Sequence, residues 1–194
     1  MPNISMLTLK ISLDETKPAV WRTIIVRGDM TLMQLHDRIQ GAMGWCDAHL
    51  HLFKIGGIAF VDHRIWDDDG GMADENGMTL KKAKLAVGDT FSYDYDMGDD
   101  WSHTVTVLER TSVPMDRSRS WVVDGAMVCP PEDVGGVYGY EDFVLAMMAP
   151  DHDEHDSYRT WYGMDFAPTL FDLSAARRIL FMLDHFGQGY PWQE

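Results

Sequence analysis

The stretch GDMTLMQLHDRIQGAMGW, residues 28 to 45, predicts one amphipathic helix. Thr31 and Gln34 have the spacing of a capping box, in which each side chain accepts a hydrogen bond from the backbone of the other residue. Gly44 ends the helical pattern. The apolar residues recur at helical spacing and are Leu32, Leu35, Ile39 and Met43. Such a helix must bury its apolar stripe against another element.

Strand-like segments lie on both sides of this helix. Before it, residues 7–13 alternate between apolar and polar, residues 20–26 are rich in β-branched side chains, and DETKP between them has turn-forming residues. After it, residues 49–61 and 91–107 have strand character. Two strands, a helix and further strands follow the order of β-grasp folds. We therefore expect the α+β class, with a β-grasp-like, mostly antiparallel sheet and one packed helix.

The second half of the chain is expected to add C-terminal helices. Residues 112–120 have the composition of a surface connector, and the acidic stretch 150–156 that of a loop. Residues 139–148 and 172–186 each have an apolar face at helical spacing, and Asp172 is suited to cap the second of these helices.

Length and composition limit the class of protein. With 194 residues we expect a single domain over 1–194, with a core at 5–111 and a connector and helical part at 112–194. A hydrophobic content of 45% excludes a disordered chain. No apolar run reaches the ~20 residues of a membrane span, and no signal peptide is recognisable, so we expect a cytoplasmic protein without membrane contact.

The charge of the chain argues against direct nucleic-acid binding. There are 16 basic and 31 acidic residues, which give a formal net charge of −15. Such a chain repels a polyanion unless its basic side chains gather in one patch, and the sequence shows no dense basic run.

The segment FSYDYDMGDDWSHTVTV, residues 91–107, predicts a hairpin whose register the sequence leaves open. A loop of two or four residues would pair Asp96 with Trp101 and Asp94 with His103, so that a carboxylate faces an imidazole. A loop of three or five residues would pair tyrosines with Trp101 and His103 instead, as in an aromatic core. Trp101, next to the turn, is expected to be partly exposed and available to a partner.

This hairpin and a later loop supply the candidate site residues. Asp99 and Asp100 follow Gly98 in the turn and have an alternative role as turn residues that bond the backbone. The candidates are Asp94, Asp96, Asp99, Asp100, Trp101, His103, Glu132, Asp133 and Tyr140.

Histidines are the candidate metal ligands, with Asp94 or Glu132 as a carboxylate partner, because catalytic zinc sites combine these ligand types. His49 and His51 are expected to share a strand face. His36 lies beside the apolar stripe of the helix, where a histidine is more often a core residue. The candidates are His36, His49, His51 and His103. No motif predicts a cofactor.

PPEDVGGVYGY, residues 130–140, places glycines ahead of a helix. Glycines in this position can expose backbone N–H groups to an anion. The alternative is a glycine-shaped turn that lies against the sheet, with Glu132 and Asp133 capping backbone groups. The spacing is not that of a phosphate-binding P-loop.

Several motifs together resemble the plasmid pRiA4b ORF-3-like family, whose members are also found with insertion sequences. These motifs are KPAVWR (17–22), LHDRIQGAMGW (35–45), HLHLF (49–53), YDMGDDW (95–101) and CPPEDVGGVYGYEDF (129–143). The resemblance implies a compact α+β domain and no established activity.

Three hypotheses for function follow. The first is a non-catalytic adaptor module that binds a protein or a small ligand. The second is a metal-dependent or hydrolase-like enzyme whose site residues are Asp94, Asp96, His103, Glu132 and Asp133. The third, a helper protein of a mobile element, rests on the resemblance alone.

Overall fold

The structure is a computed structural model that describes residues 2–66, 70–163 and 165–186. Within these residues one sheet has eight strands in the order β5-β4-β3-β6-β7-β1-β2-β8. Neighbouring strands are antiparallel except β4 and β5, which are parallel. The strands are β1 (Asn3–Leu13), β2 (Trp21–Arg27), β3 (His51–Ile55), β4 (Ile58–Val61), β5 (Ala73–Asp74), β6 (Thr90–Tyr95), β7 (Trp101–Pro114) and β8 (Trp121–Ala126).

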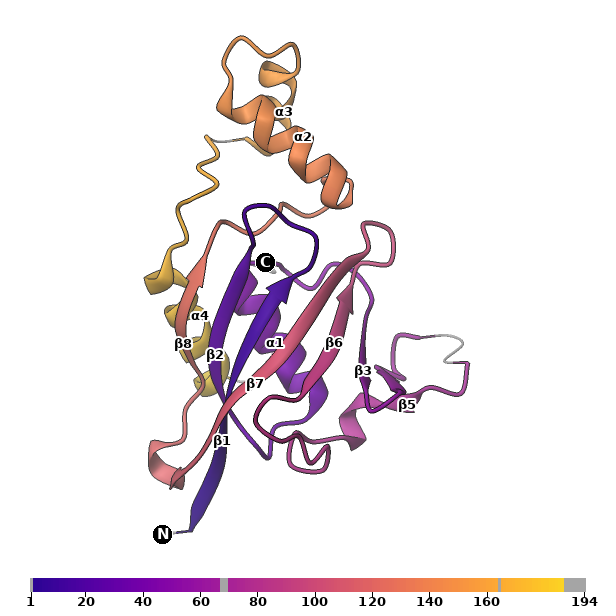
Figure 1. Cartoon of the computed structure of the whole chain (residues 1–194), viewed down its shortest axis with the longest axis vertical. Coiled ribbons are helices and arrows are strands. Elements are labelled where there is room, and N and C mark those ends of the chain that lie inside the picture. The colour runs from indigo at the N-terminus through magenta and orange to yellow at the C-terminus, as the bar shows by residue number, and fades with distance from the viewer. Residues whose placement is uncertain (1, 67–69, 164, 187–194) are drawn as a thin grey trace.

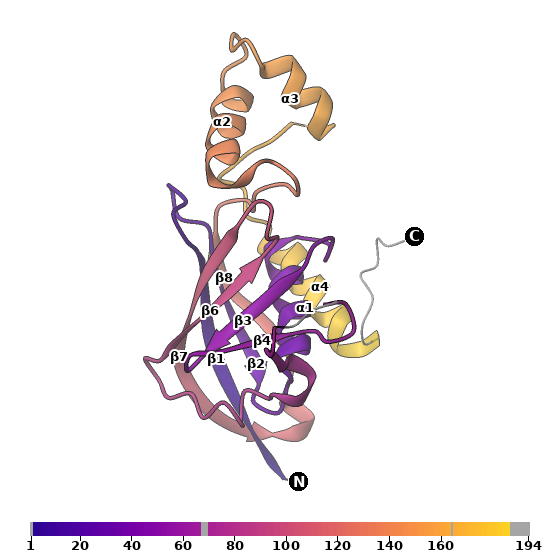
Figure 2. The same ribbon diagram turned by 90° about the vertical axis from the view of Figure 1, so that its right-hand side faces the viewer.

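The helices complete the fold and confirm the expected α+β class. They are α1 (Leu32–Met43), α2 (Gly136–Met148), α3 (His155–Tyr162) and α4 (Leu173–Phe186), with short 3₁₀ helices η1 (Glu75–Gly77) and η2 (Met115–Arg117). Figure 2 shows α1 and α4 side by side on one face of the sheet. Helices α2 and α3 lie beyond one end of the strands (Figure 1). None of the helices in the described ranges is both long enough and apolar enough to span a membrane.

Helix α1 forms as the sequence predicts. The Thr31 hydroxyl accepts from Gln34 N–H at 3.2 Å, and the Gln34 side chain accepts from Thr31 N–H at 3.0 Å. Gly44 ends the helix in the left-handed conformation, with φ 105°. The predicted apolar stripe, Leu32, Leu35, Ile39 and Met43, is buried. It belongs to the same hydrophobic core as the alternating residues of β1, which are Leu7, Leu9, Ile11 and Leu13.

Helix α4 packs closely on α1. A Cβ atom at Gly41 would lie 2.7 Å from the Ile179 side chain, so glycine is required for this approach. Ala176, Leu180 and Leu183 turn inward, as the helical spacing predicts. The C-terminal helix therefore shares the hydrophobic core of the sheet.

Some elements differ from the sequence-based expectation. Residues 112–120, expected as a connector, contain the end of β7 and the 3₁₀ helix η2, and the following β8 joins the sheet beside β2. Part of the expected acidic loop forms the first turn of α3, which begins at His155. Helix α2 begins at Gly136 rather than at Gly139.

The hairpin of β6 and β7 has a five-residue loop, from Asp96 to Asp100. Tyr95 pairs with Trp101 and Tyr93 pairs with His103, so the odd-loop alternative is correct. The expectation that Trp101 is partly exposed is wrong, because this pairing turns its ring into the core, where it is 0% exposed.

Candidate metal centre

Three segments meet at the end of the sheet nearest α2. They are residues 46–50 between α1 and β3, the turn 96–100 between β6 and β7, and the loop 129–135 before α2. Asp99 joins the last two, since its Oδ2 accepts a hydrogen bond from Gly135 N–H at 3.0 Å. A Cβ atom at Gly136 would lie 2.6 Å from the Asp99 carbonyl oxygen, so only glycine permits this contact.

The contact brings three carboxylates around one imidazole. His49 Nε2 lies 3.3 Å from Asp133 Oδ1, 3.6 Å from Asp96 Oδ2 and 3.9 Å from Glu132 Oε2. This nitrogen is buried and makes no hydrogen bond to any described residue. Ligand atoms that share one ion at about 2.1 Å are separated by roughly 3.0–3.4 Å, so the spacing is close to that of a coordination sphere.

The charge of this group calls for a cation. Within the described residues, no lysine or arginine forms an ion pair with Asp96, Glu132 or Asp133. Asp96 has only 8% of its side chain exposed, so water screens its charge weakly. Carboxylates gathered around one imidazole in this way would be stabilised by an ion that supplies two positive charges.

Other groups orient the two inner carboxylates. Glu132 Oε1 accepts from Cys46 N–H at 3.1 Å and from the Tyr95 hydroxyl at 3.0 Å. Burial raises the pKa of Tyr95, and the nearby Glu132 raises it further, so the hydroxyl stays protonated and can donate. Asp96 Oδ1 accepts from Gly98 N–H at 2.9 Å, which leaves Oδ2 turned toward His49. Such outer partners fix the direction of metal ligands.

The three carboxylate side chains of this group become more exposed from the sheet outward. Exposed fractions of the side chains rise from 8% for Asp96 and 20% for Glu132 to 72% for Asp133. Asp133 also borders a hollow of about 350 Å³ against Tyr158 and Trp161 of α3. The group is therefore open on one side, as metal centres that bind a water or a substrate are.

Other predicted site residues lie elsewhere. Asp94 is on the outer side of β6, where its oxygens bond Ser102 and Lys54. His103 is fully buried in the core, with Nδ1 3.1 Å from the Tyr93 carbonyl, and burial lowers its pKa to about 4. The structure therefore does not bring Asp94 and His103 to Asp96, Glu132 and Asp133.

The remaining candidates have structural roles. Asp100 N–H donates to the Asp96 carbonyl at 2.7 Å and so closes the hairpin turn. The Tyr140 hydroxyl donates to the Val128 carbonyl, and burial raises its pKa to about 12. At the start of α2, the Gly135 N–H group that could bind an anion already binds the Asp99 carboxylate.

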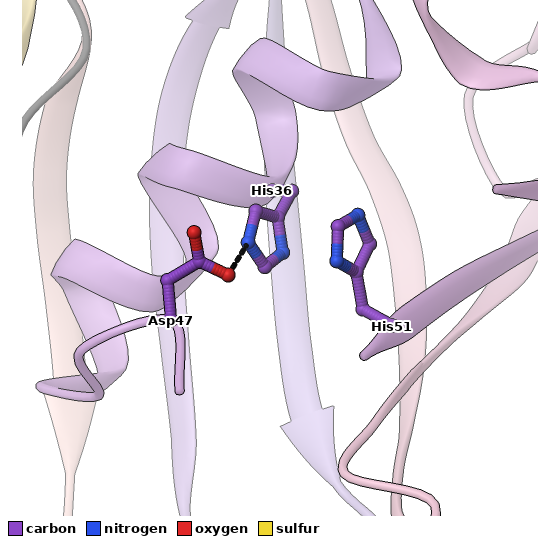
Figure 3. Close-up of side chains that lie close together, drawn as sticks. All are labelled: His36, Asp47 and His51. Atoms are coloured by element: carbon purple, nitrogen blue, oxygen red, sulfur yellow. Dashed lines mark hydrogen bonds and ion pairs between the residues drawn. The ribbon is translucent and has the colours of Figure 1, made fainter. Parts of the chain in front are cut away.

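His36 and His51 form a second histidine cluster with Asp47 (Figure 3). The prediction that His49 and His51 share a strand face is wrong, because β3 begins at His51 and His49 lies in the preceding loop. The His36 and His51 rings stack with centroids 3.5 Å apart and planes 8° apart. Because nitrogen lone pairs lie in the ring plane, two parallel stacked rings do not direct them toward a common ion.

Hydrogen bonds also occupy this second cluster. His36 Nε2 lies 2.8 Å from Asp47 Oδ1, and His36 Nδ1 lies 2.8 Å from the Tyr93 hydroxyl. Gln40 donates to the same hydroxyl, so Tyr93 donates to Nδ1 and the Nε2–H group donates to Asp47. Burial lowers the pKa of His36 to about 4, which keeps the ring neutral. His51 Nε2 pairs with the fully buried Glu75 at 2.9 Å.

Comparisons with known proteins agree with the motifs of the sequence. The uncharacterized protein y4hQ of Sinorhizobium fredii (strain NBRC 101917 / NGR234) is 35% identical over 161 residues, which are 82% of this chain and 81% of y4hQ. The crystal structure of MM3350, a protein of unknown function from Methanosarcina mazei Go1, matches with a TM-score of 0.79 and 28% identity over 88% of this chain and 97% of that one. The family model of the plasmid pRiA4b ORF-3-like proteins matches residues 5–175. The chain belongs to the plasmid pRiA4b ORF-3-like family.

Proposed function

We propose that this protein is a metal-dependent hydrolytic domain that binds one divalent transition metal ion at His49, Asp96, Glu132 and Asp133. The observation that carries the proposal is the buried, unbonded His49 Nε2 with three carboxylate oxygens at 3.3–3.9 Å. One imidazole with carboxylates is a donor set for zinc, manganese or iron(II).

The open side of the group supports a catalytic centre over a purely structural one. A bound divalent ion lowers the pKa of a coordinated water and so supplies a hydroxide near neutral pH. Asp133 is largely exposed, and the carboxylate oxygen that does not bind the ion would accept a proton from such a water. Asp96 and Glu132 are held by hydrogen bonds and keep the inner side of the site fixed.

The metal site is tested by titrating tag-free, chelator-stripped protein with Zn²⁺ by calorimetry. We expect one binding event per chain, and a loss of affinity of about 100-fold or more in His49→Ala and in Glu132→Gln, since loss of an outer partner alone costs roughly 10–100-fold. His152→Ala is the matched control, because His152 is an exposed histidine between two aspartates on a separate loop. Equal affinity in all three variants would refute the assignment.

The open coordination position has its own test. Mn²⁺-loaded protein should raise the longitudinal relaxation rate of bulk water, because a water on the ion exchanges with solvent. Competition by Zn²⁺ should lower the rate to that of the same concentration of free aqua Mn²⁺. The Mn²⁺ complex could give no more relaxation enhancement than an ion whose ligands all come from the protein. That result would contradict a hydrolytic role and would indicate a structural metal ion.

A second candidate function, the ligand-binding or adaptor module, is favoured by an apolar hollow of about 460 Å³ between α2 and the β1–β2 turn. Leu145 and Met148 on its α2 wall are 63% and 62% exposed. Apolar hollows of this size accept small molecules or anchor side chains.

Leu145→Asp should reduce the fluorescence of a bound anilinonaphthalene dye, and Leu108→Asp, on the outer face of β7, should not. Equal loss in both variants would contradict binding in this hollow.

A further inference from the structure

A hollow of about 560 Å³ lies on the other side of the molecule from α2, where α1 and α4 meet the segments that flank β7 and β8. Its wall is formed by residues from four parts of the chain. The arginines and aspartates that line it are Arg27, Asp29, Arg38, Asp116, Arg119 and Asp184. The metal centre contributes no residue to it.

Three arginines gather at this hollow, although the chain has 16 basic against 31 acidic residues. Arg27 lies at the end of β2 and makes a two-bond pair with Asp29, at 2.9 and 2.7 Å. Arg38, on α1, has only 9% of its side chain exposed and pairs with Asp184 at 3.0 Å and with Asp37 at 3.5 Å, and it donates to the Gln34 carbonyl at 3.4 Å. Arg119 precedes β8 and is exposed.

The donors at this hollow exceed the acceptors available to them. Both oxygens of Asp29 accept from Arg27, and the two oxygens of Asp184 accept from Arg38 and from Ser120 N–H. The Nε–H group of Arg38 is buried and bonds no described residue. Arg119 forms neither a hydrogen bond nor an ion pair within the described parts of the chain.

Three carboxylates line the hollow beside the three arginines, so an anion would be held there by unused N–H donors and not by a net positive charge. Asp116, exposed at the edge of the hollow, is the carboxylate that no arginine engages among the described residues. Each guanidinium has five N–H donors in a planar fork, so donors remain on Arg27 and Arg119, and on Arg38 beyond those that bond Gln34, Asp37 and Asp184. A wall with unused guanidinium donors, one of them buried, is complementary to an anion with several oxygens.

We infer that this hollow binds a small molecule through a phosphate monoester group, with Arg38 and Arg119 as its ligands and Arg27 at the margin. A phosphate has three terminal oxygens directed apart, which suits donors that come from separate segments, whereas a carboxylate is satisfied by one guanidinium fork. The volume is in the range of sites for whole small molecules, so there is room for an organic part beyond the phosphate.

The test is calorimetric titration of chelator-treated protein with glycerol phosphate and, separately, with inorganic phosphate and acetate at equal ionic strength. The chelator removes metal ions, so phosphate bound at the metal centre does not contribute. Glycerol phosphate should bind more tightly than inorganic phosphate, and acetate should not bind. Arg119→Gln should weaken glycerol phosphate binding by about tenfold, which is one hydrogen bond to a charged group.

Arg178→Gln is the matched control, because Arg178 is an exposed arginine on α4 that does not border the hollow. The variants at positions 119 and 178 alter exposed side chains, so both are expected to fold. Equal weakening in the two variants would show a general effect of charge and would overturn the assignment. Acetate binding as tight as that of glycerol phosphate would overturn the phosphate class, and equal binding of inorganic phosphate would overturn the monoester.

Discussion

His103 shows how the chemistry of one residue depends on which face of a strand it occupies. Its ring is fully buried, 5.4 Å from the Trp45 ring and 5.3 Å from the Tyr93 ring between centroids. In the even-loop register it would have faced a carboxylate and qualified as a catalytic imidazole. In the observed register it is a packing residue.

His103→Ala is therefore expected to destabilise the fold without weakening Zn²⁺ binding at the proposed site. Deleting a buried ring leaves a cavity, which costs roughly 3 kcal/mol and lowers the melting temperature by roughly 6–12 °C for a chain of this size. Thermal unfolding and the Zn²⁺ affinity of the folded variant measure the two effects. A variant with wild-type stability but no zinc binding would place His103 in the metal site.

Buried ionisable residues make stability depend on pH below neutrality. Burial lowers the pKa of His36 and of His103 to about 4, so between pH 6.5 and 4 the unfolded chain binds more protons at these residues. Their contribution is complete above pH 6.5 and is lost as the pH falls toward 4. Burial raises the pKa of Asp37 to about 6, which has the opposite effect in the same range.

We therefore expect the free energy of unfolding to fall by about 1 kcal/mol per pH unit between pH 6 and 4.5, from two histidine protons less one aspartate proton. Asp37→Asn removes the opposing contribution, so its slope should be about twice as steep. Denaturant unfolding at a series of pH values measures both slopes. Stability that rises on acidification of the wild-type protein would mean that the histidines are protonated in the fold.

At the scale of elements, the sequence predicts local structure better than it predicts register. The capping box at Thr31 and the glycine at 44 act within one turn of helix, so both ends of α1 were predictable. The β6–β7 register depends on whether the loop has an odd or even length, and five turn-forming residues permit either. Strand β8 was missed because its pairing partner, β2, lies about a hundred residues away.

Gly136 holds two elements of the proposed metal site together. Gly136→Ala would place a Cβ atom 2.6 Å from the Asp99 carbonyl and so push the hairpin turn from the loop of Glu132 and Asp133. We expect it to lose zinc affinity as well as stability. Gly56→Ala is a matched control, since Gly56 also has positive φ, at 58°, but nothing within 4 Å of the added atom.

Positive φ costs both variants roughly 1–2 kcal/mol of strain, so the difference between them isolates the clash. Calorimetric zinc titration with thermal unfolding compares the two. Unchanged zinc affinity in Gly136→Ala would show that the contact between turn and loop does not assemble the site.

At the scale of the whole molecule, the candidate site depends on tertiary structure. His49, Asp96 and Asp133 come from three loops that the sheet and α2 bring together. The sequence identified each of them as a candidate, but it grouped Asp96 and Asp133 with His103, because it placed His49 in a strand beside His51 when that strand begins only at His51. Tyr95, which orients Glu132, had the pattern of a core aromatic residue and was missed.

Metal binding would also connect the two halves of the chain, since its ligands span residues 49 to 133.

The most direct test of the proposed metal site is elemental analysis by mass spectrometry of tag-free protein purified without chelator, in wild-type and His49→Ala forms. We predict about one equivalent of zinc, manganese or iron per wild-type chain and a loss of most of it in the variant. Wild-type protein without metal, or equal metal in both forms, would contradict a metal centre at His49.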